Sequence, residues 1–425
     1  MWSGITILLL AKVLAFFLCL PIYSCLATDM AETAVLKGSS DFTKNLYKIL
    51  SRGEGNVFFS PISIHAILSL ASQGAGGATK DALTSALNVP DIKVAAEGYK
   101  AIMSRLNNIA EVTLHMANKV FLKENYKLQE AFQSIVTSHF LSEVDLVNFA
   151  ENIKAAKTIN SWVEQKTNNK IKDLIDSGDL DSDTRLVLVN AIYFKGKWAE
   201  PFNPSQTKTE KFYLDGTEHN TVDVQMMHLK KKFYFKIDET LDAKVLELPY
   251  TNKDISMLII LPNDKNGIAK LEEKLSQTDL TKITENMYRP EVMVSLPKFK
   301  IEQTIDLKDS LTELGLGNMF SDTADFSGML DSSEPLCVSK VVQKAFIEVN
   351  EEGAEAAAAT GNIVRRKMCG RDLPEEFLAD HPFFIINCGD KRSLIMFECR
   401  VLNPLNKSTQ IWLWQYLVVH FFLLL

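Results

Sequence analysis

The chain has 425 residues, of which 46% are hydrophobic and 23% are charged, and its formal net charge is -7 at pH 7. These proportions are typical of a soluble globular protein with enough apolar material for a large core, and they argue against a disordered chain or a coiled coil. The acidic balance argues against a protein that binds nucleic acid through a basic surface.

Residues 1–27 have the pattern of a cleavable signal peptide. An apolar run at 13–20 is followed by Pro21 and by the small residues Ser24 and Ala27, as expected around a cleavage site. Cleavage after Ala27 predicts a secreted, extracellular protein. The alternative is an intracellular protein that starts at Met30 and carries an artefactual extension in front of it.

Cysteine usage gives little support for a disulfide scaffold. Removal of the leader leaves only Cys337, Cys369, Cys388 and Cys399. They are too few and too clustered for a disulfide framework in a chain of this size. The fold is therefore expected to depend on its hydrophobic core.

Residues 30–404 contain no repeat, low-complexity tract or Pro/Gly-rich linker, which favours a single domain. The run 56–60 predicts a short strand. Ser60, as an N-cap hydroxyl, and Pro61, at the first helical position, predict a helix that begins here. Apolar residues at helical spacing give this helix a buried face, and the glycines within 74–77 end it.

The rest of the chain reads mainly as sheet. Residues 155–163 predict one further helix, since apolar side chains recur there at helical spacing. Apolar runs rich in β-formers and bounded by turn residues predict strands at 186–193, 245–248, 255–261 and 292–296. Two more runs, 383–386 and 394–397, flank a Cys-Gly-Asp-Lys-Arg turn and predict a hairpin. Helices mostly first and strands mostly later indicate an α+β fold.

Motifs of common enzymes are absent. The sequence has no nucleophile elbow, P-loop, complete dinucleotide fingerprint or zinc-protease motif, and its histidines lack metal-ligand spacing. No enzyme activity, metal or cofactor is predicted. A hydrolase stays open as an alternative because triads also assemble from distant residues, and the missing motifs make it the weakest one. The basic triplet 230–232 is interpreted as the solvated face of a strand edge and not as a ligand site.

The segment 351–370 is the unusual part of the chain. Its first half, Glu-Glu-Gly-Ala-Glu-Ala-Ala-Ala-Ala-Thr, is rich in strong helix formers, and its second half is Gly-Asn-Ile-Val-Arg-Arg-Lys-Met-Cys-Gly. The simplest interpretation is an exposed helix followed by a flexible loop. A basic triplet in such a loop is an accessible cleavage site for a trypsin-like protease.

From about Ser40 to Pro404 the chain resembles the serpin family of serine protease inhibitors. The resemblance rests on several segments in the family's order and spacing: 56–63, 74–79, 159–171, 188–198 and 377–384. The first of these looks like the family's shutter segment beneath the main sheet. One departure is Gln343, where many members have histidine; an amide can donate and accept hydrogen bonds but cannot titrate.

The resemblance implies one α+β domain over residues 28–404, with a large central mixed β-sheet, two further sheets, about eight to nine helices and an exposed reactive-centre loop. Glu351 would be the first residue of that loop, and the hinge that inserts would run from Gly353 to Thr360. Alternate residues of a strand face one side, so insertion would turn inward a set of mainly small side chains: Ala354, Ala356, Ala358 and Thr360. This set indicates an inhibitory member rather than a non-inhibitory serpin used for storage, transport or chaperoning.

Family spacing from the hinge implies a reactive bond between Lys367 and Met368, with Arg366 as the runner-up. A basic residue there suits a protease whose specificity pocket contains a carboxylate. The implied partner is a trypsin-like serine protease, trapped as a covalent acyl-enzyme when the loop inserts into the sheet of a monomeric suicide inhibitor.

Supporting residues follow from the same match. Ser60, Ser63 and Asn190 are expected to hydrogen-bond beneath the opening sheet, and Trp198 to pack where the hinge enters it. The alternative for each is a plain core or capping role. Cys369 is expected to be an exposed thiol.

Residues 405–425 form a C-terminal tail. Its apolar part, 411–425, is shorter than the ~20 residues of a spanning helix. It could be a membrane anchor, a removed lipid-anchor signal that lacks the usual polar spacer, or an artefactual end. A membrane partner is expected only in the first case. Asn406 begins the single N-glycosylation sequon and predicts a glycoprotein.

Overall fold

The computed structural model describes residues 27–107, 109, 111–332, 334–352, 373–389, 394–405 and 408–410. Its helices comprise residues 27–50, α2 (Pro61–Ser72), α3 (Gly77–Ala86), α4 (Ile92–Asn107), α5 (Glu130–His139), α6 (Asn152–Lys166), α7 (Ile268–Gln277) and α8 (Lys308–Leu311). Short helical turns lie at η1 (Ser177–Asp179), η2 (Pro204–Gln206), η3 (Leu280–Lys282), η4 (Thr312–Leu316) and η5 (Gly317–Phe320).

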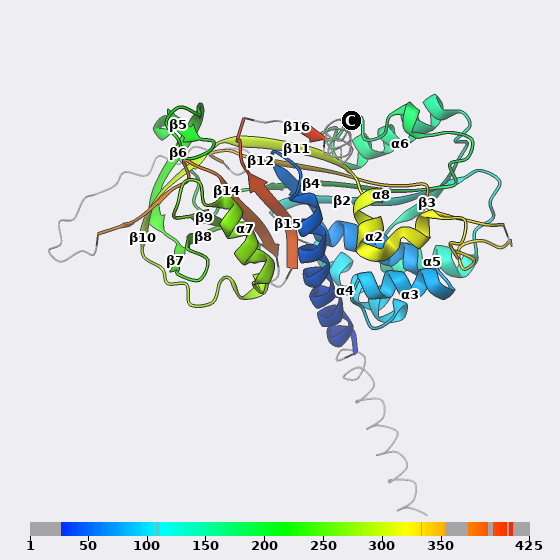
Figure 1. Ribbon diagram of the computed structural model, residues 1–425. Coiled ribbons are helices and arrows are strands. Elements are labelled where there is room, and N and C mark those ends of the chain that lie inside the picture. The colour runs from blue at the N-terminus through cyan, green and yellow to red at the C-terminus, as the bar shows by residue number, and fades with distance from the viewer. Residues whose placement is uncertain are drawn as a thin grey trace, which may run out of the picture.

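A large mixed sheet, called the main sheet here, crosses the molecule (Figure 1). Its strands in spatial order are β16 (Ser408–Gln410), β11 (Phe299–Asp306), β12 (Lys340–Val349), β4 (Leu186–Gly196), β2 (Val112–Lys123) and β3 (Glu143–Val147). β12 and β4 run parallel, whereas β4 and β2 are antiparallel. The main sheet is therefore mixed, as expected.

Two further sheets complete the α+β fold that the sequence predicts. The second sheet has the order β1 (Val57–Phe59), β15 (Leu394–Val401), β14 (Phe383–Gly389), β9 (Ser256–Pro262), β8 (Ala243–Pro249) and β7 (Tyr234–Asp238). The small sheet has the order β13 (Glu375–Leu378), β10 (Glu291–Pro297), β6 (Thr221–Lys232) and β5 (Lys208–Tyr213). All the predicted strands and the predicted 383–397 hairpin pairing are confirmed.

The main sheet is covered on both faces. On one face, α2 is buried along its whole length and packs against β15, β4 and β2. On the other face, the apolar side of α6 packs against the main sheet. Its residues Ile159 and Val163 belong to the same buried cluster as Phe121 of β2, Val189 of β4 and Val342 of β12. In Figure 1, α6 lies above the strands and α2 to α5 lie below them. Any change in the strand order of this sheet must therefore disturb packing on two sides.

Among the described residues, Cys337 and Cys399 carry free thiols. Cys388 and Cys399 are buried in the hairpin β14–β15, and burial raises the pKa of the Cys399 thiol. Cys369 lies outside the described residues. The described part of the domain is thus held by its core and its hydrogen bonds, as the sequence predicts.

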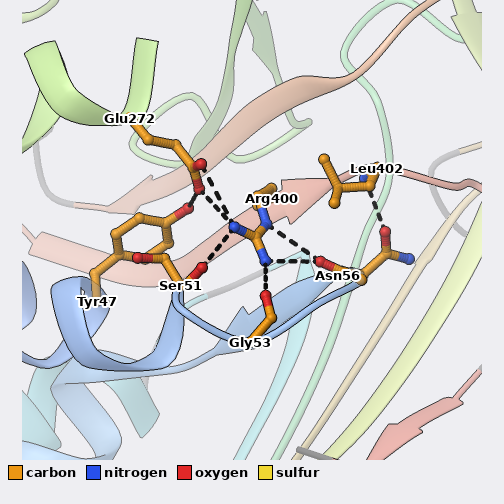
Figure 2. Close-up of polar contacts among 8 residues, drawn as sticks. Tyr47, Ser51, Gly53, Asn56, Glu272, Arg400 and Leu402 are labelled. Carbon is orange, nitrogen blue, oxygen red and sulfur yellow. Dashed lines mark hydrogen bonds and ion pairs between the residues drawn. The ribbon is translucent and has the colours of Figure 1, made fainter. Parts of the chain in front are cut away.

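Arg400 joins three distant segments of the chain (Figure 2). Its guanidinium donates to the carbonyl oxygens of Ser51 at 2.9 Å, Gly53 at 2.7 Å and Gly55 at 2.8 Å, and pairs with Glu272 of α7 at 3.2 Å. The Arg400 side chain is only 6% exposed. A fork of fixed N–H donors is suited to satisfying several acceptors at once. The arginine therefore fastens the end of the 27–50 helix and α7 to the second sheet.

Replacing Arg400 by methionine keeps the side-chain length and removes every donor. We expect the free energy of unfolding to fall by about 3 to 5 kcal/mol, because the Glu272 carboxylate and three carbonyls lose their partner. Urea unfolding followed by circular dichroism measures the change. Arg52→Met is the control, since its ion pair with Glu313 is about half exposed and should contribute less than about 1 kcal/mol. Equal losses in the two variants would contradict this assignment.

Candidate functional site

The boundary between β12 and β4, called the seam here, is the centre of the candidate site. The two strands pair directly and in parallel, from Lys340 opposite Val187 to Ile347 opposite Phe194. The chain leaves β12 at Val349. A segment that turned back between the two strands would be antiparallel to β12, and therefore also antiparallel to β4. An added strand at this position would replace one parallel pair by two antiparallel pairs.

The expected site residues divide into two groups. Ser60, Ser63, Asn190, Trp198 and Glu351 lie within the described residues, and all five are buried. The others lie outside the described residues: Gly353, Ala354, Ala356, Ala358, Thr360, Arg366, Lys367, Met368 and Asn406. The geometry below therefore concerns the sheet and the base of the loop.

A buried chain of polar side chains crosses the seam. Asn190 on β4 donates from its amide nitrogen to the Ser63 hydroxyl and to the Asn118 side-chain oxygen on β2. Its own oxygen accepts a hydrogen bond from Gln343 on β12, at 2.6 Å. Register explains the meeting, because Asn190 lies directly opposite both Asn118 and Gln343 on its two neighbouring strands. Ser63 and Asn190 thus bond to each other beneath the sheet, and the role expected for them when the sheet opens stays a prediction.

Gln343 also holds the start of α2. Its side-chain oxygen accepts from the Ser60 N–H at 2.9 Å, and its nitrogen donates to the Ser60 carbonyl at 3.1 Å. This pair of bonds uses both halves of the amide. The glutamine thus takes a hydrogen-bonding role at this position without a group that titrates near neutral pH.

The expected N-cap role of Ser60 is wrong in one respect. Ser60 occupies the N-cap position and Pro61 the first turn, but the Ser60 hydroxyl makes no capping bond. It donates instead to the carbonyl of Met396 on β15, at 2.6 Å. A buried backbone carbonyl of the second sheet competes for this hydroxyl, so Ser60 joins α2 to that sheet.

The opposite side of the seam is tied to the chain that follows α6. The Lys344 ammonium on β12 donates to the carbonyl oxygen of Lys172 and pairs with Glu302 of β11 at 2.9 Å. The Lys344 side chain is 10% exposed. Hydrogen bonds from a charged donor are stronger than neutral ones. The seam is therefore held from both faces, by amides below and by an ammonium above.

The base of the loop is fixed at the upper end of β12. The Trp198 indole N–H donates to the Asn350 carbonyl at 2.9 Å, and the Trp198 backbone N–H donates to the Glu352 carbonyl at 3.2 Å. The indole ring stacks on Tyr250, with ring centroids 4.6 Å apart. Trp198 thus holds Asn350 and Glu352, the part of the chain just before the predicted hinge, and its role at that hinge stays a prediction.

Glu351 is anchored by its carboxylate. One oxygen accepts from the Thr207 hydroxyl at 2.8 Å, and the other pairs with the Lys298 ammonium at 2.8 Å. Burial acts to raise the pKa of Glu351, but the bonds from Lys298 and Thr207 outweigh it and hold the pKa below the ordinary value. The carboxylate is thus charged at neutral pH and locks the first residue of the predicted loop.

Three members of this site were missed by sequence reasoning: Asn118, Thr207 and Lys298. Asn118 could have been found from the sequence. Alternate residues of β2 are apolar and face inward, and Asn118 is the one polar residue at these inward positions. Thr207 and Lys298 are ordinary surface types in the sequence, and only their approach to Glu351 gives them a role.

The basic triplet 230–232 belongs to the end of β6 and not to the seam. The Lys230 ammonium pairs with Glu291 at 3.2 Å and that of Lys231 with Glu200 at 3.1 Å. These paired, half-exposed lysines fit the interpretation of a solvated strand end.

Comparison with known proteins gives consistent results. The family model "Serpin (serine protease inhibitor)" matches residues 37–404. A leukocyte elastase inhibitor of Bos taurus is 41% identical over 358 residues, which cover 82% of this chain and 93% of that protein. Serine protease inhibitor 42Dd of Drosophila melanogaster is 38% identical over 368 residues, covering 85% and 95%.

Solved structures share the architecture. The crystal structure of Serpin48 from the insect Tenebrio molitor has a TM-score of 0.78 and 36% sequence identity, over 87% of this chain and 98% of that one. The topology described above is therefore shared by related proteins over nearly their whole length.

Replacing Gln343 by leucine removes the amide and nearly preserves the volume. We expect the free energy of unfolding to fall by about 2 to 6 kcal/mol, because the buried Ser60 N–H and Asn190 oxygen each lose a partner, at about 1 to 3 kcal/mol each. Urea unfolding measures the loss. The exposed Gln225, which bonds Thr209 on the small sheet, gives the matched control Gln225→Leu, expected within about 0.5 kcal/mol. If Q343L had the same free energy of unfolding as the parent, the seam would not depend on this amide.

Replacing Glu351 by glutamine tests the charge at the hinge. Because the folded-state pKa is lowered, the charge contributes stability above about pH 4.5, and this contribution is lost as the pH falls through the folded-state pKa. We expect the variant to be less stable than the parent by about 1 kcal/mol at pH 7, since Lys298 is partly exposed. The difference should shrink below pH 4.5 in unfolding curves taken at successive pH values. A difference that stays constant with pH would rule out an electrostatic cause.

Proposed function

Since this chain belongs to the serpin family of serine protease inhibitors, we propose that it traps trypsin-like serine proteases as a suicide substrate. The bovine and Drosophila proteins to which it is similar are named as protease inhibitors, and the family is one of inhibitors and not of enzymes. The observation that carries the proposal is the seam: two parallel strands that pair directly, next to a loop base fixed at the end of one of them.

The path of the chain supports insertion. Residues 353–372 connect the end of β12 in the main sheet to Leu373, just before β13 in the small sheet. Cleavage within this segment would free its first part from the small sheet. That part, held at Glu351 and Trp198, would then be able to fold back between β12 and β4. The hydrogen-bonding edges exposed by an opening seam would be satisfied by the entering strand.

The proposed reactive bond joins Lys367 and Met368, with Arg366 as the alternative. The serine oxygen of the protease attacks the Lys367 carbonyl carbon, the amide bond breaks, and the serine proton leaves on the new amino group of Met368. The basic side chain selects a protease with a carboxylate in its specificity pocket, because an unpaired buried carboxylate disfavours other residues.

Insertion then carries the acylated protease along the sheet. A strand from Gly353 to Lys367 spans roughly 50 Å at about 3.3 Å per residue. Distortion of the protease active site would prevent deacylation, so the ester would persist. The inhibitor contributes no catalytic group to this sequence of steps; it contributes conformational energy released when the loop is cut.

We also propose that the protein is secreted, with residues 1–27 removed and Asn406 glycosylated. The leader composition and the Asn-Lys-Ser sequon support this. Within the described residues, no helix is long and apolar enough to cross a membrane. Expression of the full chain in insect or mammalian cells, followed by N-terminal sequencing of the protein in the medium and glycosidase treatment, tests the proposal. Retention in the cytosol with the leader intact would overturn it.

The decisive experiment incubates the protein with trypsin and follows the products by denaturing gel and mass spectrometry. We expect a covalent complex and cleavage after Lys367. Lys367→Ala should slow inhibition by about 10⁴-fold, because the specificity pocket then holds an unpaired carboxylate. Cleavage after Arg366 would instead move the reactive bond by one residue.

A matched pair of hinge variants tests insertion. Ala358→Arg places a bulky charge on the inward set, whereas Ala357→Arg places it on the outward set. We expect A358R to be cleaved as a substrate with little complex, and A357R to keep forming complex. Rapid cleavage of the parent without complex, across several trypsin-like proteases, would favour a non-inhibitory serpin with a storage, transport or chaperone role.

A further inference from the structure

Exposed apolar side chains gather around β13, the first strand after residues 353–372. Four large ones reach solvent here: Leu373 is 90% exposed, Ile237 of β7 53%, Tyr288 46% and Met293 of β10 40%. β7 and β10 lie at the end of the molecule opposite α6 and β3 (Figure 1). These four residues are called the apolar patch here.

Tyr288 and Met293 flank β13. The Tyr288 hydroxyl donates to the carboxylate of Glu375 at 3.0 Å, two residues beyond Leu373. Met293 lies directly opposite Glu376, since β10 and β13 pair in parallel. Neighbouring strands are about 4.8 Å apart and three residues span at most about 11 Å, so the Met293 backbone lies within about 16 Å of Leu373.

Ile237 belongs to the same surface. It pairs with Lys244 across β7 and β8, and the Lys244 ammonium donates to the carbonyl of Glu376 at 3.0 Å. Phe235 lies on the same face of β7 as Ile237, and its ring packs edge-on against Tyr288, with ring centroids 5.9 Å apart. The apolar patch is therefore continuous from β7 to β13.

The length of chain before Leu373 limits where a captured protease lies. Six residues lead from Lys367 to Leu373, and they extend at most about 22 Å. A protease domain of roughly 230 residues has a radius of gyration of about 17 Å and thus a diameter of about 45 Å. A protease that holds the Lys367–Met368 bond in its cleft is wider than this tether is long. The side of its cleft that receives the leaving group therefore faces the patch.

A contact between tethered bodies needs little affinity of its own. Because the loop already holds the protease, a second contact is intramolecular, and short linkers give effective concentrations of about 1 mM or more. Apolar and aromatic side chains are typical centres of protein interfaces. The nearest charges are already engaged, since Lys230, opposite Met293, pairs with Glu291 at 3.2 Å. The surface thus suits an apolar partner.

We propose that the apolar patch is a second docking surface for the trypsin-like protease that the loop captures. It contacts the rim of the protease cleft on the leaving-group side. The proposal rests on the proposed function and adds a contact made before the bond is cut. The patch therefore raises the rate of inhibition and leaves the final yield of trapped protease unchanged.

The docking is tested with trypsin whose catalytic serine is replaced by alanine, because this protease binds without cutting. Threonine keeps the preference for a strand. We expect the Kd, measured by surface plasmon resonance, to rise about threefold for Ile237→Thr and about tenfold for Ile237→Thr with Met293→Thr, the effect of about 1.4 kcal/mol. Leu146→Thr, on β3 at 50% exposure, is the matched control and should bind as the parent does.

Footprinting with hydroxyl radicals locates the contact, because exposed methionine is readily oxidised. We expect oxidation of Met293 and Tyr288 to fall by at least about half when the inert trypsin is bound. Met30, which is 74% exposed on the helix 27–50, is the control and should react equally in both states.

The outcomes separate the patch from the proposed function. Equal Kd values for the parent and the double variant would overturn the docking surface, even where active trypsin is still trapped as a covalent complex. A parent that binds inert trypsin through the patch but never traps the active enzyme would support the docking and overturn the suicide mechanism. Protection of Met293 in the free protein at rising concentration would assign the patch to a second copy of this chain and overturn the proposal.

Discussion

The direct pairing of β4 with β12 is the contact on which the rest of this structure depends. It closes the main sheet between two long strands that run the same way, and parallel pairing is slightly weaker per residue than antiparallel pairing. An additional strand from the chain beyond β12 would be antiparallel to both neighbours. Under the insertion that we propose, one parallel pair would be replaced by two antiparallel pairs, and the contacts around the seam would oppose its opening.

Those features act on both faces. Beneath the seam, Asn190 and Gln343 bond to each other, so separating the strands breaks a buried contact whose partners have no water available. Leaving a buried polar group without its partner costs more free energy than the intact hydrogen bond contributes. Partial separation of the two strands is therefore unfavourable. Above the seam, Lys344 and the apolar side of α6 add a second set of contacts. The entry point is fixed separately, by Trp198 and Glu351.

Much of this could be predicted from particular residues. Pro61 after Ser60 marked the start of α2, and the apolar runs marked β4, β8, β9, β10, β14 and β15. β2, β3, β11 and β12 of the main sheet were among the strands missed, although β2 alternates inward and outward residues along its length. Ser60 was correctly placed at a helix start, but its hydroxyl bonds to Met396, 336 residues away. Local sequence favours a cap, and the competing acceptor belongs to another sheet.

By itself, the sequence determined the α+β class, the family resemblance, and the alternation of small residues after Gly353, because these depend on local composition and on spacing along the chain. Only the tertiary structure decided that Asn118, Asn190 and Gln343 stand side by side, since strand register brings together residues that the sequence separates. It likewise gave Lys298 and Thr207 their place on Glu351. Hydrogen bonds and ion pairs act over about 3 Å of space whatever the separation along the chain, and no pattern within a short window of sequence encodes them.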